Sequence, residues 1–235
     1  MRVFADRHDA GRVLAERLAA YAGREDVIVL GLPRGGVVVA YEVALALHAP
    51  LDVYVVRKLG VPGQEELAFG AIASGGVRVL NHDVIRDAGV TDQVIEAATA
   101  REKVELERRE RLFRGGRPPL DLQGKTVILV DDGLATGASM RTAILSLGAH
   151  HPAWVTMAVP TAPPSTCQDL AREVDEAVCV ITPAQFWGVG QWYMDFSQTS
   201  DAEVIALLRA ADARMARSAG DGAAEGTTAQ AERPS

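Results

Sequence analysis

The sequence predicts an α/β fold with a doubly wound parallel sheet of about five strands and flanking helices. Short apolar runs rich in Val and Ile alternate along the chain with longer amphipathic segments, which is the order of β-α-β units. These runs are apolar throughout, which is typical of strands covered on both faces. Glycine-rich or acidic turns follow two of the runs, at the strand ends where open parallel sheets bind ligands.

The expected elements follow one another in chain order. Parallel strands are expected at 27–30, 53–56, 127–130, 154–159 and 177–181. Helices are expected at 9–21, from about 36 to 47, and at 91–112, 138–147, 165–173 and 201–215. Between the second strand and the long charged helix, a mobile loop at 57–66 leads into a β-hairpin of two strands, 67–73 and 77–80.

We expect a single domain over 1–215 and a disordered tail over 216–235. The tail is rich in Ala, Gly, Ser and Glu and has almost no apolar bulk. Burial therefore cannot offset the entropy that ordering it would cost. The helix before it carries Val204 and Leu208, which can pack against the domain.

Composition narrows the class of protein. The net charge of −7 argues against an extended nucleic-acid surface, so an anionic ligand must be held by local cations and backbone amides. Cys167 and Cys179 have no metal or redox spacing, and we expect two reduced thiols in a cytoplasmic protein. The N-terminal residues are too charged for a secretory signal, and no apolar run is long enough to span a membrane.

The segment 127–139 is the most informative part of the chain. A buried strand is followed by two adjacent acids and then by a loop of mostly small residues that leads into a helix. The acids and loop residues are Asp131, Asp132, Gly133, Leu134, Ala135, Thr136, Gly137, Ala138 and Ser139. Backbone amides of such a loop, the following helix N-terminus and the hydroxyls of Thr136 and Ser139 suit a phosphate. Carboxylates at the strand end can accept hydrogen bonds from sugar hydroxyls, so the segment predicts a ribose phosphate site.

This segment resembles the motif with which type I phosphoribosyltransferases bind phosphoribosyl pyrophosphate: four apolar residues, two acids and a small-residue loop ending in Thr-Gly. The resemblance implies transfer of the 5-phosphoribosyl group to a nitrogenous base with release of pyrophosphate. It also implies Mg²⁺, bound mainly through substrate oxygens and assisted by Asp131 and Asp132. An ordinary turn with Asp caps is the alternative, but it does not explain two adjacent acids.

A second loop, Pro33-Arg34-Gly35-Gly36, matches the position of the family's pyrophosphate loop. Arg34 adds a bidentate donor there. Arg57 and Lys58 close the next expected strand, and we assign these three cations a catalytic role in neutralising the leaving pyrophosphate. Residues 60–66 resemble the flexible loop that closes over the family's reaction centre. The alternative is that the cations lie on the surface beside ordinary turns.

The segment 182–198 is unusually aromatic and resembles the family's hood, the element that holds the base. Phe186 or Trp187 is the expected stacking residue, and Asp195 and Gln185 could read the polar edges of a base. Clustered aromatic residues also build small cores or dimer contacts, so a core role and a homodimer remain open. Ala135 stands where family members that use 6-oxopurines carry Asp, which leaves the base undefined.

A non-catalytic function is the competing hypothesis. Some proteins of this fold sense phosphoribosyl pyrophosphate or a nucleotide and regulate a partner. The retained pyrophosphate loop and the pair Arg57-Lys58 favour an enzyme, and the acidic net charge disfavours a nucleic-acid regulator.

Overall fold

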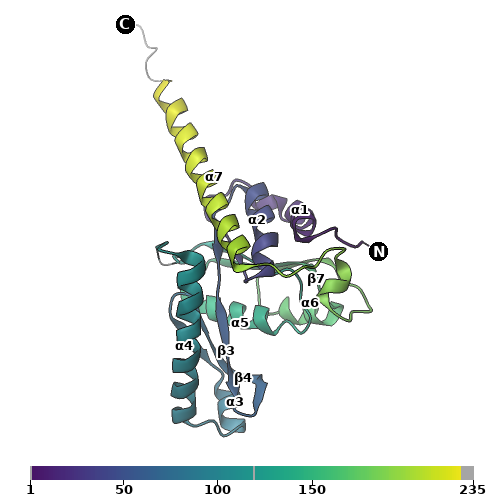
Figure 1. Ribbon diagram of the computed structural model, residues 1–235, viewed down its shortest axis with the longest axis vertical. Coiled ribbons are helices and arrows are strands. Elements are labelled where there is room, and N and C mark those ends of the chain that lie inside the picture. The colour runs from purple at the N-terminus through teal and green to yellow at the C-terminus, as the bar shows by residue number, and fades with distance from the viewer. Residues whose placement is uncertain (1, 119, 229–235) are drawn as a thin grey trace.

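A parallel five-stranded sheet forms the centre of the structure, a computed structural model that describes residues 2–118 and 120–228 (Figure 1). The strand order is β2-β1-β6-β7-β8, and each neighbouring pair is parallel. The strands are β1 (Val27–Gly31), β2 (Leu51–Val53), β6 (Thr126–Val130), β7 (Trp154–Thr161) and β8 (Glu176–Ile181). The predicted α/β fold with a five-stranded parallel sheet is confirmed.

Helices cover both faces of this sheet (Figure 1). One face carries α1 (Arg7–Arg17), α2 (Gly35–Leu47) and the start of α7 (Asp201–Thr228), and the other carries α5 (Ala138–Leu147) and α6 (Pro164–Leu170). Along β6, Ile128 and Val130 enter the core beneath α1 and α2, whereas Val127 and Leu129 enter the core beneath α5. Because alternate residues of one strand enter two different cores, the whole run is apolar. Short 3-10 helices are η1 (Ala19–Tyr21), η2 (Gly148–His150) and η3 (Val189–Trp192).

A second sheet, three-stranded and antiparallel, consists of β3 (Val56–Val61), β4 (Gln64–Ala73) and β5 (Val77–Leu80). The expected hairpin is confirmed as β4 and β5. The long helix α4 (Asp92–Arg114) and the short helix α3 (His82–Asp87) accompany this sheet (Figure 1). The strand expected at 53–56 is divided, because β2 ends at Val53 and β3 begins at Val56.

The expected mobile loop at 57–66 is wrong, since most of this segment belongs to strands. In β3, Arg57 pairs with Ile72 and Lys58 with Ala71 of β4. Leu59 of β3 is fully buried in the same core as Phe69 of β4. The strand β3 thus has a buried apolar residue as well as its charged side chains. The charged residues and glycines of this segment suggested a loop, but pairing between β3 and β4 makes most of it strand.

The last helix extends further than expected. Val204 and Leu208 are buried, as the sequence indicated, but α7 continues to Thr228 and does not end near Met215 (Figure 1). Residues 216–228 of the expected disordered tail are thus helical, because each residue added to an existing helix gains a hydrogen bond without a new nucleation step. Residues 229–235 lie outside the described residues. Within the described chain, the helices lack the combination of length and apolarity needed to cross a membrane.

The expectation of two reduced thiols is also wrong. Cys167 of α6 and Cys179 of β8 form a disulfide, with their Cα atoms 6.7 Å apart. Their separation of 12 residues follows no recognised motif. The two residues meet because α6 connects β7 to β8 and packs back against the sheet, which is a tertiary relationship that spacing alone does not reveal.

Candidate functional site

The two predicted phosphate loops leave neighbouring strands. β1 and β6 are hydrogen-bonded neighbours in the middle of the sheet, with Gly31 opposite Val130. The pairing continues one step further, because the amide of Leu32 donates to the carbonyl of Val130 at 2.9 Å. Loops 32–36 and 131–137 therefore begin side by side at the carboxyl edge of the sheet, where open parallel sheets bind ligands.

The first loop packs directly on the acid pair. Its Pro33–Arg34 peptide bond is cis. A Cβ atom on Gly35 would lie 2.0 Å from Oδ2 of Asp132, and one on Gly36 would lie 2.8 Å from the Cα of Asp131. The two positions have no room for a side chain, so the glycines bring the backbone of the first turn of α2 against both acids.

The second loop forms an open pocket at the start of α5. The pocket has a volume of about 210 Å³ and is lined by Asp131, residues 133–140 and Val189 of η3. Gly137 caps α5 with a φ of +72°, and a Cβ there would come within 2.9 Å of Thr166 and of Leu170 on α6. The hydroxyl of Thr166 also donates to the carbonyl of Ala135 at 3.1 Å. The helix α6 thus supports the loop from behind, while Thr136 and Ser139 are exposed.

The acid pair is largely withdrawn from solvent. The side chain of Asp132 is 16% exposed, and Oδ1 of Asp131 accepts a hydrogen bond from the amide of Asp132 at 2.8 Å. Burial raises the pKa of both carboxyl groups, and the neighbouring charge of Asp132 raises that of Asp131 further. Carboxyl groups in a pocket whose pKa is raised by burial are typical of functional sites.

Arg7 is a site residue that the sequence did not reveal. It is the first residue of α1, and its Nε donates to Oδ2 of Asp132 at 2.7 Å. Its Nη1 donates to the carbonyl of Ser197 at 2.7 Å, and its guanidinium lies 4.0 Å from the ring centre of Phe196. One weak signal exists, because a cation in the first turn of a helix is unfavourable to the helix dipole and calls for a compensating contact.

Tyr193 holds the same region from the hood. Its hydroxyl donates to the backbone carbonyl of Asp132 at 2.5 Å, and burial raises the pKa of Tyr193. The hood and the N-terminal segment pair through their backbones, since the amide of Phe4 donates to Trp192 and that of Met194 donates to Phe4, both at 2.8 Å. The hood is therefore fastened to the N-terminal segment and to the acid pair.

The three predicted cations have different surroundings. Nη1 of Arg34 lies 3.7 Å from Oδ1 of Asp201 at the start of α7. Arg57 donates twice to Oε2 of Glu102 on α4, at 2.6 and 2.9 Å. Burial opposes the charge of Glu102, but Arg57 and Arg101 outweigh it, so the pKa of Glu102 is lowered. Arg34 and Arg57 thus pair with acids of two different helices, α7 and α4.

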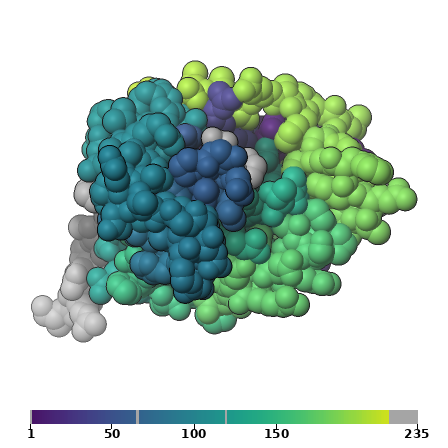
Figure 2. All heavy atoms as spheres, turned by 90° about the horizontal axis from the view of Figure 1, so that it is seen from below, coloured from purple at the N-terminus to yellow at the C-terminus, as the bar shows by residue number. Residues whose placement is uncertain are grey.

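Lys58 lines a pocket of about 300 Å³ between β3 and α4, together with Arg57 and with Ser139 at the start of α5. The antiparallel sheet and the loop at the start of α5 therefore meet at this pocket. In Figure 2 the surface is hollowed between the blue atoms of the antiparallel sheet and the yellow-green atoms of the hood.

The predicted stacking residues differ in exposure. Phe186 packs on Trp192, with ring centres 6.4 Å apart and planes inclined by 27°. Trp187 is 89% exposed. Phe186, Trp192 and Tyr193 thus belong to a small core with Phe4, which is the alternative that the sequence left open, whereas Trp187 does not. A stacking role for either residue stays a prediction.

Comparisons with known proteins agree with this geometry. The model of the phosphoribosyl transferase domain family matches residues 6–195. Two Mycobacterium tuberculosis proteins, from strains CDC 1551 and H37Rv and both provisionally named as a phosphoribosyl transferase, are 52% identical over 208 residues. The match covers 88% of this chain and 47% of theirs, so the chain spans about half the length of these curated relatives.

A solved structure is also similar along almost its whole length. The crystal structure of TT1426 from Thermus thermophilus is 44% identical, with a TM-score of 0.80, over 88% of this chain and 98% of that one. The family match, the relatives and the paired loops at the carboxyl edge lead to one conclusion: the chain belongs to the phosphoribosyl transferase domain family.

Proposed function

We propose that this chain transfers the 5-phosphoribosyl group of phosphoribosyl pyrophosphate to a nitrogenous base and releases pyrophosphate. One observation carries the proposal: the glycine loop 33–36 packs on the acid pair, directly beside the open loop at the start of α5. Two anion-binding loops flanking two carboxylates suit a sugar that carries phosphate groups at both ends.

The proposed roles follow the positions of the residues. The amides of 133–139 and the hydroxyls of Thr136 and Ser139 bind the 5′-phosphate. Asp131 and Asp132 orient the ribose hydroxyls. The backbone of 33–36 holds the pyrophosphate, and Arg34, Arg57 and Lys58 supply positive charge around it. In the structure Arg57 is engaged with Glu102, so its contribution requires exchange of that ion pair for the pyrophosphate.

The reaction needs no covalent enzyme intermediate. A nitrogen lone pair of the base forms a bond to C1′ as the bond from C1′ to the pyrophosphate oxygen breaks, and the electrons of that bond leave with pyrophosphate. A proton leaves the attacking nitrogen when it carries one. The protein accelerates this step by positioning both reactants and by stabilising charge on the leaving group.

The carboxylates suit Mg²⁺, which prefers oxygen ligands and keeps several from water or substrate phosphates. Burial raises the pKa of Asp131 and of Asp132, and a bound cation would favour the ionised form of both carboxyl groups. Among the described residues, the structure shows no group of three or more His, Cys, Asp or Glu side chains that could hold a metal ion. Substrate oxygens would therefore complete the shell, and the ion would screen the pyrophosphate charge.

The base is proposed to bind beneath the hood, against Phe186 or Trp187. Ala135, in place of an acid, gives no specific partner for a 6-oxopurine, so the acceptor has to be found by experiment. The proposal keeps the cytoplasmic location, although the Cys167–Cys179 disulfide removes the argument from reduced thiols. Measurement of mass in solution tests for a homodimer.

The decisive experiment is an incubation of the protein with phosphoribosyl pyrophosphate, Mg²⁺ and a panel of purines, pyrimidines and related heterocycles. We expect pyrophosphate release with at least one base, and none with Arg34→Ala. Tight binding of phosphoribosyl pyrophosphate without release across the panel would favour the sensing regulator. Calorimetry with RNA and DNA would then test whether that regulator binds nucleic acid.

A further inference from the structure

Arg7 joins three parts of the chain that are distant in sequence. Its guanidinium contacts the carboxylate of Asp132 after β6, the carbonyl of Ser197 and the ring of Phe196 in the hood. The side chain of Arg7 is only 11% exposed. A guanidinium that is largely removed from water needs such contacts to compensate its charge. Asp132 is bound by Nε, Ser197 by Nη1, and Phe196 lies against the planar face of the group.

Asp132 is held from both its side chain and its backbone. Arg7 fixes the carboxylate, Tyr193 donates to the carbonyl, and the amide donates to Asp131. Asp132 is therefore oriented by groups that come from α1 and the hood. Asp131 differs, because its carboxylate faces Gly36 of the first phosphate loop and lines the pocket of the second.

The 5′-phosphate loop has other supports. Gly137 packs against α6, and Thr166 of α6 holds the carbonyl of Ala135. The contacts that Arg7 makes with Asp132, Ser197 and Phe196 are all outside residues 133–139. A change at Arg7 should therefore reach the acid pair, and Gly35 beside it, without reaching residues 133–139.

We propose that Arg7 is a positioning residue for the ribose. Through its contacts with Asp132 and Phe196 it sets the orientation of the acid pair and couples the hood to it. The two acids then have different tasks, with Asp131 engaging the ribose directly and Asp132 held in place by Arg7. This inference rests on the proposed function, because it assigns the ribose to the same acid pair.

The proposal predicts a selective loss of affinity that separates ribose from phosphate. Calorimetry measures the binding of ribose 5-phosphate and of inorganic phosphate to wild type and to Arg7→Gln. We expect ribose 5-phosphate to bind about tenfold more weakly to the variant, which is about 1.4 kcal/mol, while the affinity for phosphate stays the same. General damage to the fold would weaken both ligands, so the ratio of the two affinities is the informative readout.

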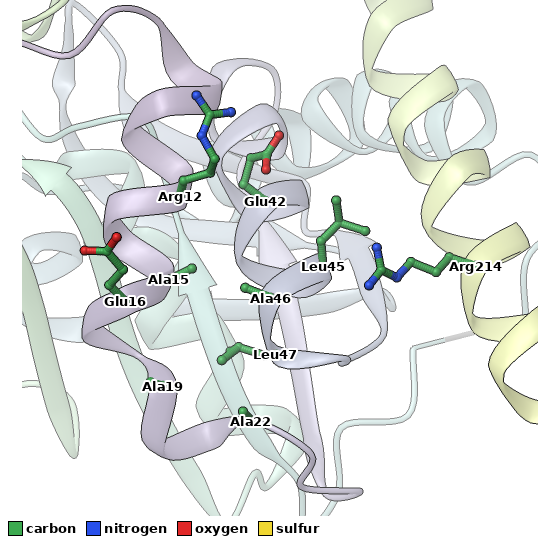
Figure 3. A pocket seen from close by; sticks show the side chains of 10 residues that line it. All are labelled: Arg12, Ala15, Glu16, Ala19, Ala22, Glu42, Leu45, Ala46, Leu47 and Arg214. Atoms are coloured by element: carbon green, nitrogen blue, oxygen red, sulfur yellow. The ribbon is translucent and has the colours of Figure 1, made fainter. Parts of the chain in front are cut away.

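Three further variants sharpen the test. Arg12→Gln is the matched control, because Arg12 is on the same helix but lines a different pocket, between α1, α2 and α7 (Figure 3). It should change neither affinity. Phe196→Leu keeps the charge of Arg7 and removes the ring beneath it, so it should reproduce part of the selective loss even if Arg7→Gln does not fold. The double variant Arg7→Gln with Asp132→Asn should lose little more than either single variant, because both disrupt one interaction.

The outcomes distinguish this inference from the proposed function. If Arg7→Gln binds ribose 5-phosphate with the affinity of the wild type, the inference is overturned and the proposed function is not. An equal loss of affinity for ribose 5-phosphate and for phosphate has the same consequence. If Arg7→Gln does not fold, unchanged affinities in Phe196→Leu overturn it. A wild-type protein that binds neither ligand overturns the proposed function and the inference with it.

Discussion

Gly35 and Asp132 lie so close that a Cβ atom on Gly35 would be 2.0 Å from Oδ2 of the carboxylate. The two residues come from loops after different strands, and β1 and β6 bring them together because these strands are neighbours in the sheet. The same Cβ would also lie 2.7 Å from Nε of Arg7. The glycine is therefore part of the site and not only of a turn.

Gly35→Ala should disturb the acid pair. The added methyl group forces Asp132 and Arg7 apart, so we expect weaker binding of phosphoribosyl pyrophosphate and a loss of about 1–3 kcal/mol in the free energy of unfolding. Calorimetry and urea unfolding measure the two effects. Gly148→Ala is the control, because a Cβ there meets nothing within 4 Å and φ is −54°. Equal behaviour of the two variants would contradict the close packing at Gly35.

Asp131→Asn should separate stability from binding. Burial and the charge of Asp132 raise the pKa of Asp131 above its usual value, so its ionised form opposes folding. We expect the variant to bind phosphoribosyl pyrophosphate poorly but to be more stable by about 1 kcal/mol at neutral pH. The amide oxygen of Asn can still accept from the backbone amide of Asp132.

The pH dependence of Asp131→Asn has a defined sign. A carboxyl group whose pKa is raised in the folded protein lowers stability as the pH increases from about 4 through the folded-state pKa. The variant lacks this loss, so the difference between its free energy of unfolding and that of the wild type should grow with pH and vanish in acid. Thermal unfolding of the ligand-free protein with a chelator present measures the difference. An advantage that stays constant with pH would point to packing instead of charge.

Breaking the disulfide should lower stability and affect the phosphate loop. Cys167 and Cys179 close a short loop, and removal of such a crosslink costs about 2–4 kcal/mol. Thr166 adjoins Cys167 and holds Ala135, so we also expect weaker binding of inorganic phosphate. Unfolding and calorimetry are measured with and without dithiothreitol. Cys167→Ser with Cys179→Ser is the control, because the chain has no other cysteine and the reductant should not affect it.

Truncation should distinguish the two halves of α7. Val204, Leu208 and Ala211 are buried, and Arg117 donates to the carbonyl of Leu208 at 2.9 Å. We expect a chain that ends before Asp201 to unfold at a markedly lower temperature. A chain that ends at Arg217 should keep the thermal midpoint and the ligand affinity of the full chain. A clear loss on removing only residues 218–235 would show that they dock, on the domain or on a second copy.

The sequence by itself determined the features that depend on local pattern. The uninterrupted apolar runs predicted the parallel strands, since a strand covered on both faces has no polar side. The two acids and the small-residue loop after β6 predicted a phosphate and ribose site, and the structure places these residues at the carboxyl edge of the sheet, while the site itself stays a prediction. These inferences hold over short stretches because strand burial, turns and helix starts are decided by residues a few positions apart.

Tertiary structure decided what depends on distant partners. The charged segment 57–66 becomes largely strand because β4 pairs with it, and Cys167 meets Cys179 because α6 folds back on the sheet. Arg7 reaches Asp132 across 125 residues. No local pattern can specify such contacts, because burying a charge or joining two thiols becomes favourable only after the core has brought the partners together.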